Sequence, residues 1–150
     1  MLLLRAPSLS AAALEREAWR LTAGSPVQVL ISSRCDIALA SGAAGVNLPE
    51  RDIAVADARR LLGRRVVGRS VHSREAAAQA QAEGADFVVF GPVWASPSHP
   101  GQTPKGLEAL RALAREVKVP VLAIGGLTEE RVAEVEAAGA AGYAAIGMFR

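Results

Sequence analysis

The sequence predicts an α/β protein of the (β/α)8 barrel type, in which parallel strands alternate with helices. The first observation is that short apolar runs recur about every 20 to 30 residues and are continuous rather than alternating, as in strands covered on both faces. The second is that helical patterns separate most of these runs. The expected strands are Leu2–Arg5, Val27–Ile31, Gly45–Leu48, Val66–Val71, Asp86–Gly91, Val119–Ile124 and Gly142–Met148.

The helical patterns carry local signals for their starts and ends. Ser73 and Thr128 precede their helices and can cap free backbone N–H groups, while Glu129 favours the positive end of a helix dipole. Three helix exits share a glycine, an alanine and then a strand, which indicates one repeated βα unit. The expected helices are Ala11–Ala23, Val55–Leu62, Arg74–Glu83, Gly106–Val117 and Glu129–Ala138, with a short helical stretch at Cys35–Ala40.

The ends of the last strands favour a barrel over an open doubly wound sheet. No glycine-rich dinucleotide loop follows the first strand. The strand before Gly125–Gly126 and the strand through Ile146–Gly147 both end in glycine-rich turns, which is where barrels of this type bind phosphate. We count seven strands rather than eight. We therefore expect one domain, residues 1–150, whose barrel lacks its first βα unit and its last helix unless another chain fills the gap.

The composition of the 150 residues limits the function. A hydrophobic fraction of 51% suffices for one core. Scattered basic residues, a net charge of +2 and 4% aromatic residues argue against nucleic-acid binding. The single cysteine, Cys35, excludes an internal disulfide, and no segment has the length of a signal sequence or membrane span. We expect a cytoplasmic protein, a homo-oligomer, that binds neither nucleic acid nor membrane.

Candidate binding residues gather where strands end. Backbone N–H groups around Gly125–Gly126, with Ile146 and Gly147 from the next strand, can surround a phosphate. Arg5 ends the first strand and suits an anionic group. Ser70 and His72 fall on the same side of their strand, where His72 can shuttle protons. A long segment, residues 91–106, has the character of a lid that carries Ser96, Ser98 and His99.

These segments together resemble the thiamin phosphate synthase/TenI superfamily over nearly the whole chain. The stretches that carry the resemblance are Ile31–Ala40, Gly45–Leu48, Gly68–Ser73, Ala85–Val93 and Pro120–Gly126. The resemblance implies an eight-stranded barrel whose second strand is the first strand seen here.

The resemblance implies one of two activities. The synthase branch joins a pyrimidine diphosphate to a thiazole phosphate and releases pyrophosphate with the help of Mg²⁺. Of its pattern the chain keeps Arg5 and Asp52, but Ser32–Ser33 stand in place of an Asn-Asp pair, and Ser96, Ser98 and His99 replace a Thr-x-Thr-Lys lid. The TenI branch includes thiazole tautomerases, which need proton transfer and a phosphate anchor but no metal. Some of its members carry a functional histidine where this chain has Pro92.

The sequence thus favours a TenI-like protein of thiamin biosynthesis, an isomerase that acts on a thiazole phosphate without a cofactor. In this interpretation His72 and His99 are catalytic, and the substrate is bound by Arg5, Ser70, Ser96, Ser98, Gly125, Gly126, Ile146 and Gly147. One alternative is a thiamin phosphate synthase with a reduced Mg²⁺–diphosphate site, in which Asp52 holds the metal. Another is a protein that binds or senses a phosphorylated ligand without catalysis.

Overall fold

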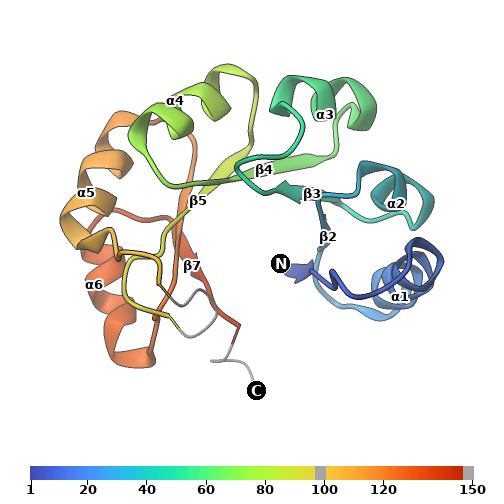
Figure 1. Ribbon diagram of the computed structural model, residues 1–150, viewed down its shortest axis with the longest axis horizontal. Coiled ribbons are helices and arrows are strands. Elements are labelled where there is room, and N and C mark those ends of the chain that lie inside the picture. Colours follow the sequence, from blue (N-terminus) through green and yellow to red (C-terminus); the bar gives the residue numbers. More distant parts are fainter. Residues whose placement is uncertain (97–100, 147–150) are drawn as a thin grey trace. The chain divides into compact units, whose positions relative to one another are not determined.

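The computed structural model, which describes residues 1–96 and 101–146, confirms a parallel α/β protein (Figure 1). Its strands form a seven-stranded sheet in chain order, β1 to β7. The pairs β1–β2, β2–β3, β5–β6 and β6–β7 are parallel. The chain divides into two compact units, Met1–Gly68 and Arg69–Arg150. The eight-stranded barrel, its missing parts and the single domain over residues 1–150 stay predictions.

The first unit alternates strands and helices from its start. Its elements are β1 (Leu2–Leu4), α1 (Ala11–Gly24), β2 (Val29–Ser32), α2 (Cys35–Ala40), β3 (Gly45–Leu48) and α3 (Val55–Leu62), followed by the beginning of β4 (Val66–Val71). The core lies around β2 and β3, where Ile31 pairs in register with Val46 and both side chains are fully buried. Leu14 and Ala18 are the buried side chains of α1. An apolar stripe of this kind fixes which face of the helix points inward.

The second unit continues the same alternation. After the end of β4 come α4 (Arg74–Ala82), β5 (Phe87–Phe90), α5 (Gly106–Glu116), β6 (Val121–Ile124), a 3-10 turn (Glu129–Arg131), α6 (Val132–Ala137) and β7 (Gly142–Ala144). All four residues of β5 are buried, which explains why this strand reads as an unbroken apolar run. Leu110 and Leu113 of α5 complete the core of this unit.

The expected capping holds at one helix and fails at another. The hydroxyl of Ser73 accepts a hydrogen bond of 3.1 Å from the backbone N–H of Ala76 and so caps α4. The cap predicted at Thr128 is wrong, because its side chain makes no capping hydrogen bond to the backbone. The expected helix Glu129–Ala138 instead begins as a 3-10 turn. The three glycine exits are confirmed, since Gly42, Gly84 and Gly139 all have positive φ.

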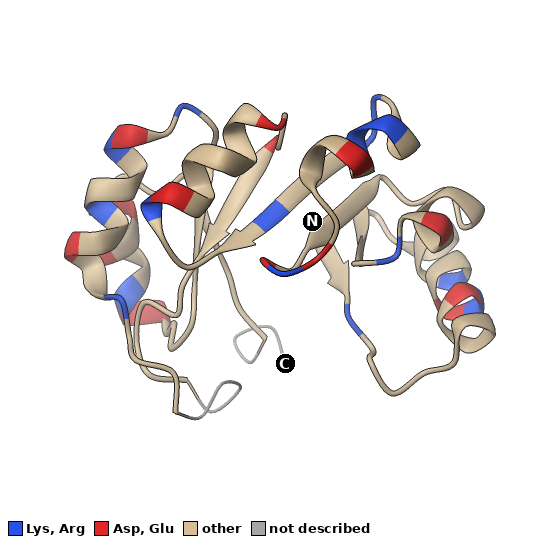
Figure 2. Ribbon diagram, turned by 45° about the horizontal axis from the view of Figure 1, so that its top comes forward, with Lys and Arg blue, Asp and Glu red and all other residues tan. Residues whose placement is uncertain are grey.

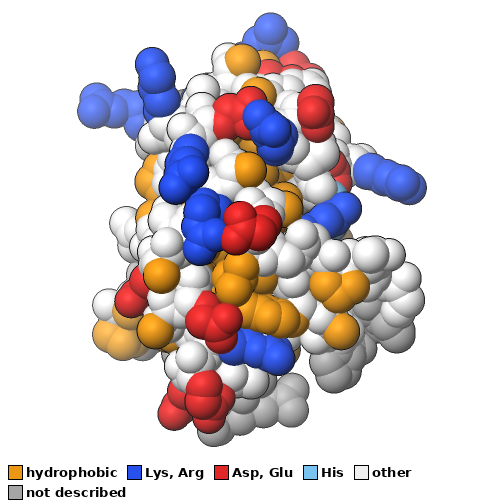
Figure 3. Space-filling model, turned by 90° about the vertical axis from the view of Figure 1, so that its left-hand side faces the viewer, with side chains coloured by type: hydrophobic (Ala, Val, Ile, Leu, Met, Phe, Trp, Pro, Cys, Tyr) orange, Lys and Arg blue, Asp and Glu red, His pale blue; other side chains and the backbone are white. Residues whose placement is uncertain are grey.

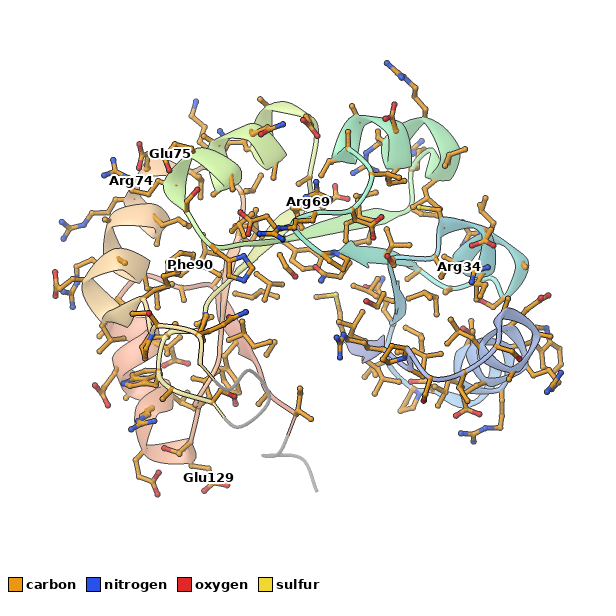
Figure 4. The ribbon with its side chains drawn as sticks, in the orientation of Figure 1. Arg34, Arg69, Arg74, Glu75, Phe90 and Glu129 are labelled. Carbon is orange, nitrogen blue, oxygen red and sulfur yellow. The ribbon has the colours of Figure 1, made fainter. Side chains whose placement is uncertain are left out.

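Charges of both signs are mixed over the outer helices. Figure 3 shows basic and acidic side chains interspersed on the face that carries α5 and α6. Arg74, at the start of α4, forms an ion pair with Glu116 at the end of α5 (Figure 4). Within the described residues, no helix combines the length and the apolar character that a membrane span requires.

Candidate functional site

The first candidate cluster lies after β2 and β3, within the first unit. Ser33 directly follows β2 and has a φ of 71°, and no other described residue except glycine has a positive φ. Its backbone N–H donates a 3.1 Å hydrogen bond to the carbonyl oxygen of Asn47 in β3. Its hydroxyl donates a hydrogen bond to the carboxylate of Asp52. The local backbone therefore turns the Ser33 side chain toward Asp52, the carboxylate that the sequence analysis named as a possible metal ligand.

Asp52 is held from two sides. One carboxylate oxygen accepts the Ser33 hydroxyl, and the other accepts a 2.8 Å hydrogen bond from the backbone N–H of Ile53. The side chain is half-buried. Within residues 1–96 and 101–146, no three His, Cys, Asp or Glu side chains gather as a metal site. The cluster thus offers one carboxylate and one hydroxyl as oxygen ligands.

The residues that follow Ser33 form the start of α2, with Arg34 at its N-cap position and Cys35 as its first residue. Arg34 forms a bidentate ion pair with Asp36, with hydrogen bonds of 2.8 and 2.6 Å, and lowers the pKa of that carboxyl (Figure 4). Cys35 is buried, and burial raises the pKa of its thiol, an effect that the nearby charge of Asp52 strengthens. A buried thiol with a raised pKa is a poor nucleophile. These features favour a structural role for Cys35.

Arg5 lies just beyond the end of β1 and is exposed. An exposed guanidinium at the carboxyl end of a parallel strand has the reach and the charge to meet an anionic ligand. The substrate-binding role predicted for Arg5 stays a prediction.

The second candidate cluster is the turn after β6, within the second unit. Gly125 and Gly126 have φ values of 96° and 65°, which side chains other than glycine rarely adopt. A Cβ atom on Gly125 would lie 2.6 Å from the Cβ of Pro92, and one on Gly126 would lie 2.5 Å from the carbonyl oxygen of Ala95. Both the backbone conformation and the crowding therefore require glycine at these positions.

The segment after β5 frames this turn. The backbone N–H of Val93 donates to the carbonyl oxygen of Ile124 at 2.8 Å, and that of Trp94 donates to Gly125 at 3.1 Å. The Arg131 guanidinium donates a 2.5 Å hydrogen bond to the carbonyl oxygen of Gly126. Its Cζ atom also lies 4.8 Å from the centre of the Trp94 ring, in a cation–π contact. The diglycine turn is thus a braced structure rather than a loose connection.

The remaining predicted residues lie in the same unit. Ser70 lies in β4 and His72 just after it, and both are half-buried, as is Ser96 after β5. Ile146 follows β7 and is 61% exposed. Ser98, His99 and Gly147 lie outside the described residues, as does part of the expected lid. The catalytic and binding roles given to all these residues stay predictions.

Two structural features were missed in the sequence. The turned backbone at Ser33 has no local signal, because serine is an ordinary residue in strands and loops. Trp94 and Arg131 are far apart along the chain, so their contact depends on the pairing of β5 with β6. The one usable sign was Trp94 itself, a large aromatic residue in a segment otherwise rich in glycine and proline.

A family model and individual relatives of known name point to the same protein family. Residues 1–149 match the family described as Thiamine monophosphate synthase, TMP-TENI. The thiamine-phosphate synthase of Chloroflexus aurantiacus is 40% identical over 127 residues, which are 84% of this chain and 59% of that protein. The one of Anaeromyxobacter dehalogenans is 48% identical over 120 residues, 79% of this chain and 54% of that protein. The chain thus spans little more than half the length of these two relatives.

A solved structure supports the same relationship. Thiamine phosphate pyrophosphorylase from Pyrococcus furiosus superimposes with a TM-score of 0.82 at 31% identity, over 96% of this chain and 71% of that one.

These relatives correct the function that the sequence favoured. The expectation of a TenI-like thiazole tautomerase, an isomerase, is wrong: relatives at 40% and 48% identity are named synthases, which are transferases. The expectation gave too much weight to one short stretch, Gly68–Ser73, and to single departures such as Ser33. Identity spread over most of a core reports ancestry better than six residues at the end of one strand. The chain belongs to the thiamine monophosphate synthase (TMP-TENI) family.

Proposed function

We propose that this chain carries the synthase chemistry of its family, joining a pyrimidine diphosphate to a thiazole phosphate with release of pyrophosphate. The structural observation that carries the proposal is the braced diglycine turn Gly125–Gly126, an anchor for a phosphate in a chain whose relatives are named thiamine-phosphate synthases.

The reaction is a substitution and involves no oxidation or reduction. The ring nitrogen of the thiazole forms a bond to the methylene carbon of the pyrimidine, while the bond from that carbon to the diphosphate oxygen breaks. The electron pair of the broken bond leaves on pyrophosphate, and the thiazole nitrogen becomes positively charged. A protein can promote this step by fixing both phosphorylated substrates and by stabilising the charge on the leaving group.

The second unit supplies the anchor for the thiazole phosphate. Gly125 and Gly126 have no side chains that could block a phosphate from their backbone, and both pack against the segment of Pro92 and Ala95, while Arg131 contacts Gly126 and Trp94. Preorganised backbone N–H groups bind phosphate without the cost of ordering a loop. In this proposal Ser70, Ser96, Ile146 and Gly147 border the same ligand.

The first unit supplies the groups suited to Mg²⁺ and diphosphate. Mg²⁺ prefers oxygen ligands and is commonly held by one or two carboxylates together with substrate phosphates. The half-buried Asp52 carboxylate, with the Ser33 hydroxyl against it, fits such a shared site. Asp52 would hold the ion, which neutralises negative charge on the diphosphate when bound. Arg5 adds a second positive charge for an anionic group in this proposal.

His72 has a smaller part in this chemistry than in a tautomerase, because the substitution needs no proton shuttle. We propose that it borders the substrate at the end of β4, where it is half-buried. We propose a similarly small part for His99, a residue of the expected lid that lies outside the described residues. Neither assignment is needed for the test of the main proposal.

The first prediction is that the purified chain makes thiamin phosphate and pyrophosphate from the two substrates in the presence of Mg²⁺. Pyrophosphate release, followed with a coupled phosphate assay, measures the rate, and mass spectrometry identifies the product. Asp52→Asn keeps the size of the side chain but removes its charge, so it should raise the Mg²⁺ requirement at least about tenfold. Asp57→Asn, which changes an exposed carboxylate on α3, should leave the rate unchanged.

Two results would contradict the proposal. One is the absence of product from a folded chain at millimolar Mg²⁺. The other is equal loss of activity in Asp52→Asn and Asp57→Asn. Binding of the thiazole phosphate without turnover would point instead to a protein that binds the ligand and does not catalyse the reaction.

A further inference from the structure

Arg131 places a positive charge directly against the diglycine turn. It ends the 3-10 turn Glu129–Arg131, five residues after Gly126, and it is half-buried. Its guanidinium reaches back along the chain and donates the 2.5 Å hydrogen bond to the carbonyl oxygen of Gly126. Hydrogen bonds from a charged donor are stronger than those between neutral groups. The contact therefore joins a fixed cation to the backbone of the turn.

This hydrogen bond acts on the peptide group that joins Gly126 to Leu127. In a planar trans peptide the C=O and the N–H point in opposite directions, so the N–H of Leu127 points away from the guanidinium. No backbone carbonyl of the described residues accepts the N–H of Gly126 or of Leu127. A hydrogen bond to the oxygen of a peptide group polarises that group and makes its N–H a stronger donor. Arg131 thus strengthens one of the backbone donors that the turn can offer to a phosphate.

Trp94 keeps the guanidinium in this position. The Cζ atom of Arg131 lies 4.8 Å from the centre of the indole ring. The backbone N–H of Trp94 donates a 3.1 Å hydrogen bond to the carbonyl oxygen of Gly125, so the ring is attached to the same turn. A planar guanidinium can stack on an aromatic ring and donate a hydrogen bond at its edge at the same time, whereas an ammonium group is a point charge without such a face. The two contacts together favour arginine at position 131.

The charge of Arg131 also acts on a bound phosphate directly. A phosphate held by the N–H of Leu127 would lie one peptide group away from the guanidinium. A cation at that separation attracts a phosphate dianion, and salt reduces the attraction where water reaches the site. The acidic neighbours Glu129 and Glu130 are exposed, so water screens their opposing charge.

We infer that Arg131 is a positioning residue of the phosphate anchor, which raises the affinity for the substrate phosphate through the Gly126–Leu127 peptide while Trp94 holds its guanidinium. This inference rests on the proposed function, in which the diglycine turn binds the thiazole phosphate. A residue that only braced the turn would serve the thiazole phosphate and the unphosphorylated thiazole alcohol equally. A cation that acts on the phosphate favours the phosphorylated form alone.

The test measures binding of the thiazole phosphate and of the thiazole alcohol to the whole chain by titration calorimetry. Arg131→Met keeps the aliphatic stem but removes the charge and the donors, so it should weaken binding of the thiazole phosphate about tenfold or more. Binding of the alcohol should change less than about twofold. Arg131→Lys keeps the charge and should recover part of the lost affinity. In steady-state kinetics the loss should appear in the KM for the thiazole phosphate and leave kcat within about twofold.

A second substitution tests the part of Trp94. Trp94→Leu removes the ring beneath the guanidinium, so it should weaken binding of the thiazole phosphate in the original chain but have little further effect in Arg131→Met. Figure 2 shows acidic and basic positions mixed on the outer helices of this unit. Arg111→Met on α5, which removes an arginine paired with Glu108, is the matched control and should bind both ligands as the original chain does. Circular dichroism spectra that match those of the original chain establish that each variant is folded.

The outcomes distinguish this inference from the proposed function. If the folded original chain does not bind the thiazole phosphate, the proposed function fails, and the inference fails with it. If the original chain binds the thiazole phosphate and Arg131→Met binds it equally well, only the inference is overturned. Equal loss of affinity for the thiazole phosphate and the alcohol in Arg131→Met also overturns it, since Arg131 would then act only as a brace of the turn.

Discussion

At the scale of single residues, Ser33 shows how local strain and a functional contact are linked. A residue other than glycine in the left-handed region is held there by its surroundings at a cost of about 1 kcal/mol or more. Here the surroundings are the hydrogen bond from the Ser33 N–H to Asn47 and the hydrogen bond from its hydroxyl to Asp52. The hydroxyl bond also contacts the carboxylate that we assign to Mg²⁺.

Two substitutions at Ser33 distinguish the effect of backbone strain from the effect of losing the side-chain hydroxyl. Ser33→Ala removes the hydroxyl and keeps the strain, so we expect the free energy of unfolding to fall by about 1–2 kcal/mol. Ser33→Gly also removes the hydroxyl but adopts a φ of 71° without steric cost. The glycine variant should therefore be more stable than the alanine variant by about 1 kcal/mol, measured by urea denaturation.

The relative stability of the two variants shows whether the backbone at residue 33 is strained. If Ser33→Ala is as stable as Ser33→Gly, or more so, the backbone at this position carries no strain worth relieving. In both variants, loss of the hydroxyl beside Asp52 should also weaken Mg²⁺ binding and so raise the Mg²⁺ concentration that the reaction requires, which the pyrophosphate assay measures on the same samples.

Sequence reasoning reached part of this chemistry. It selected the diglycine turn because paired glycines before a helix stand out in a short sequence, and it reached Asp52 only through the resemblance to the synthase pattern. It did not find the turned backbone of Ser33 or the Trp94–Arg131 contact, because both depend on hydrogen bonds between segments that only the folded chain brings together.

At the scale of elements, the diglycine turn after β6 is where packing and backbone conformation act together. Gly126 and Gly139 both have positive φ, of 65° and 89°. They differ in their surroundings: a Cβ atom on Gly126 would lie 2.5 Å from the Ala95 carbonyl oxygen, whereas one on Gly139 would make an ordinary 3.5 Å contact with Ala114. Alanine substitutions at Gly126 and Gly139 therefore distinguish the cost of backbone strain from the cost of steric crowding within one unit.

Gly139→Ala should cost about 1 kcal/mol of unfolding free energy, the strain of a left-handed alanine. Gly126→Ala adds a clash with the backbone of residues 94 and 95, so we expect a cost of about 3 kcal/mol or more. Only Gly126→Ala should also weaken binding of the thiazole phosphate, measured by calorimetry at a temperature where both variants are folded. Equal costs for the two substitutions would show that the turn relaxes easily and is not braced.

The elements themselves were predicted closely, and the exceptions have physical causes. The bounds of β3, β4, α2 and α3 agree with expectation at both ends. The expected helix Glu129–Ala138 failed at its start, where the Thr128 side chain makes no capping hydrogen bond and a 3-10 turn forms. A capping signal in sequence does not reveal whether the hydroxyl reaches the backbone N–H groups that it could cap.

At the scale of the whole molecule, the parallel order of the strands followed from the sequence, whereas the activity did not. Periodicity reports burial, and buried parallel strands have a distinctive pattern. Activity depends on which few polar groups remain at the strand ends, and relatives with different chemistry share that framework. The choice between tautomerase and synthase therefore needed the comparison over the full length of the chain.

The surface carboxylates of the molecule give it a predictable response to acid. Hydrogen bonds from Arg20, Arg34 and Arg74 lower the pKa of Glu17, Asp36 and Glu116 respectively. A carboxyl whose pKa is lower in the folded state binds protons more readily once the chain unfolds. Its stabilising effect is therefore present above the ordinary carboxyl pKa and is lost as the pH falls through the lowered value.

We accordingly expect the melting temperature to be steady near neutral pH and to fall as the pH drops below about 4.5. These ion pairs account for only a modest part of the fall in melting temperature, roughly a few degrees, because the carboxylates are exposed and water and salt screen them. Scanning calorimetry between pH 3 and 7 measures the effect, and 0.5 M NaCl should reduce it. Arg74→Gln removes the partner of Glu116 and should make the melting temperature less sensitive to acid than in the original chain. A chain whose melting temperature depends on pH to the same degree with and without Arg74 would show that this ion pair, the one that joins α4 to α5, contributes nothing to stability.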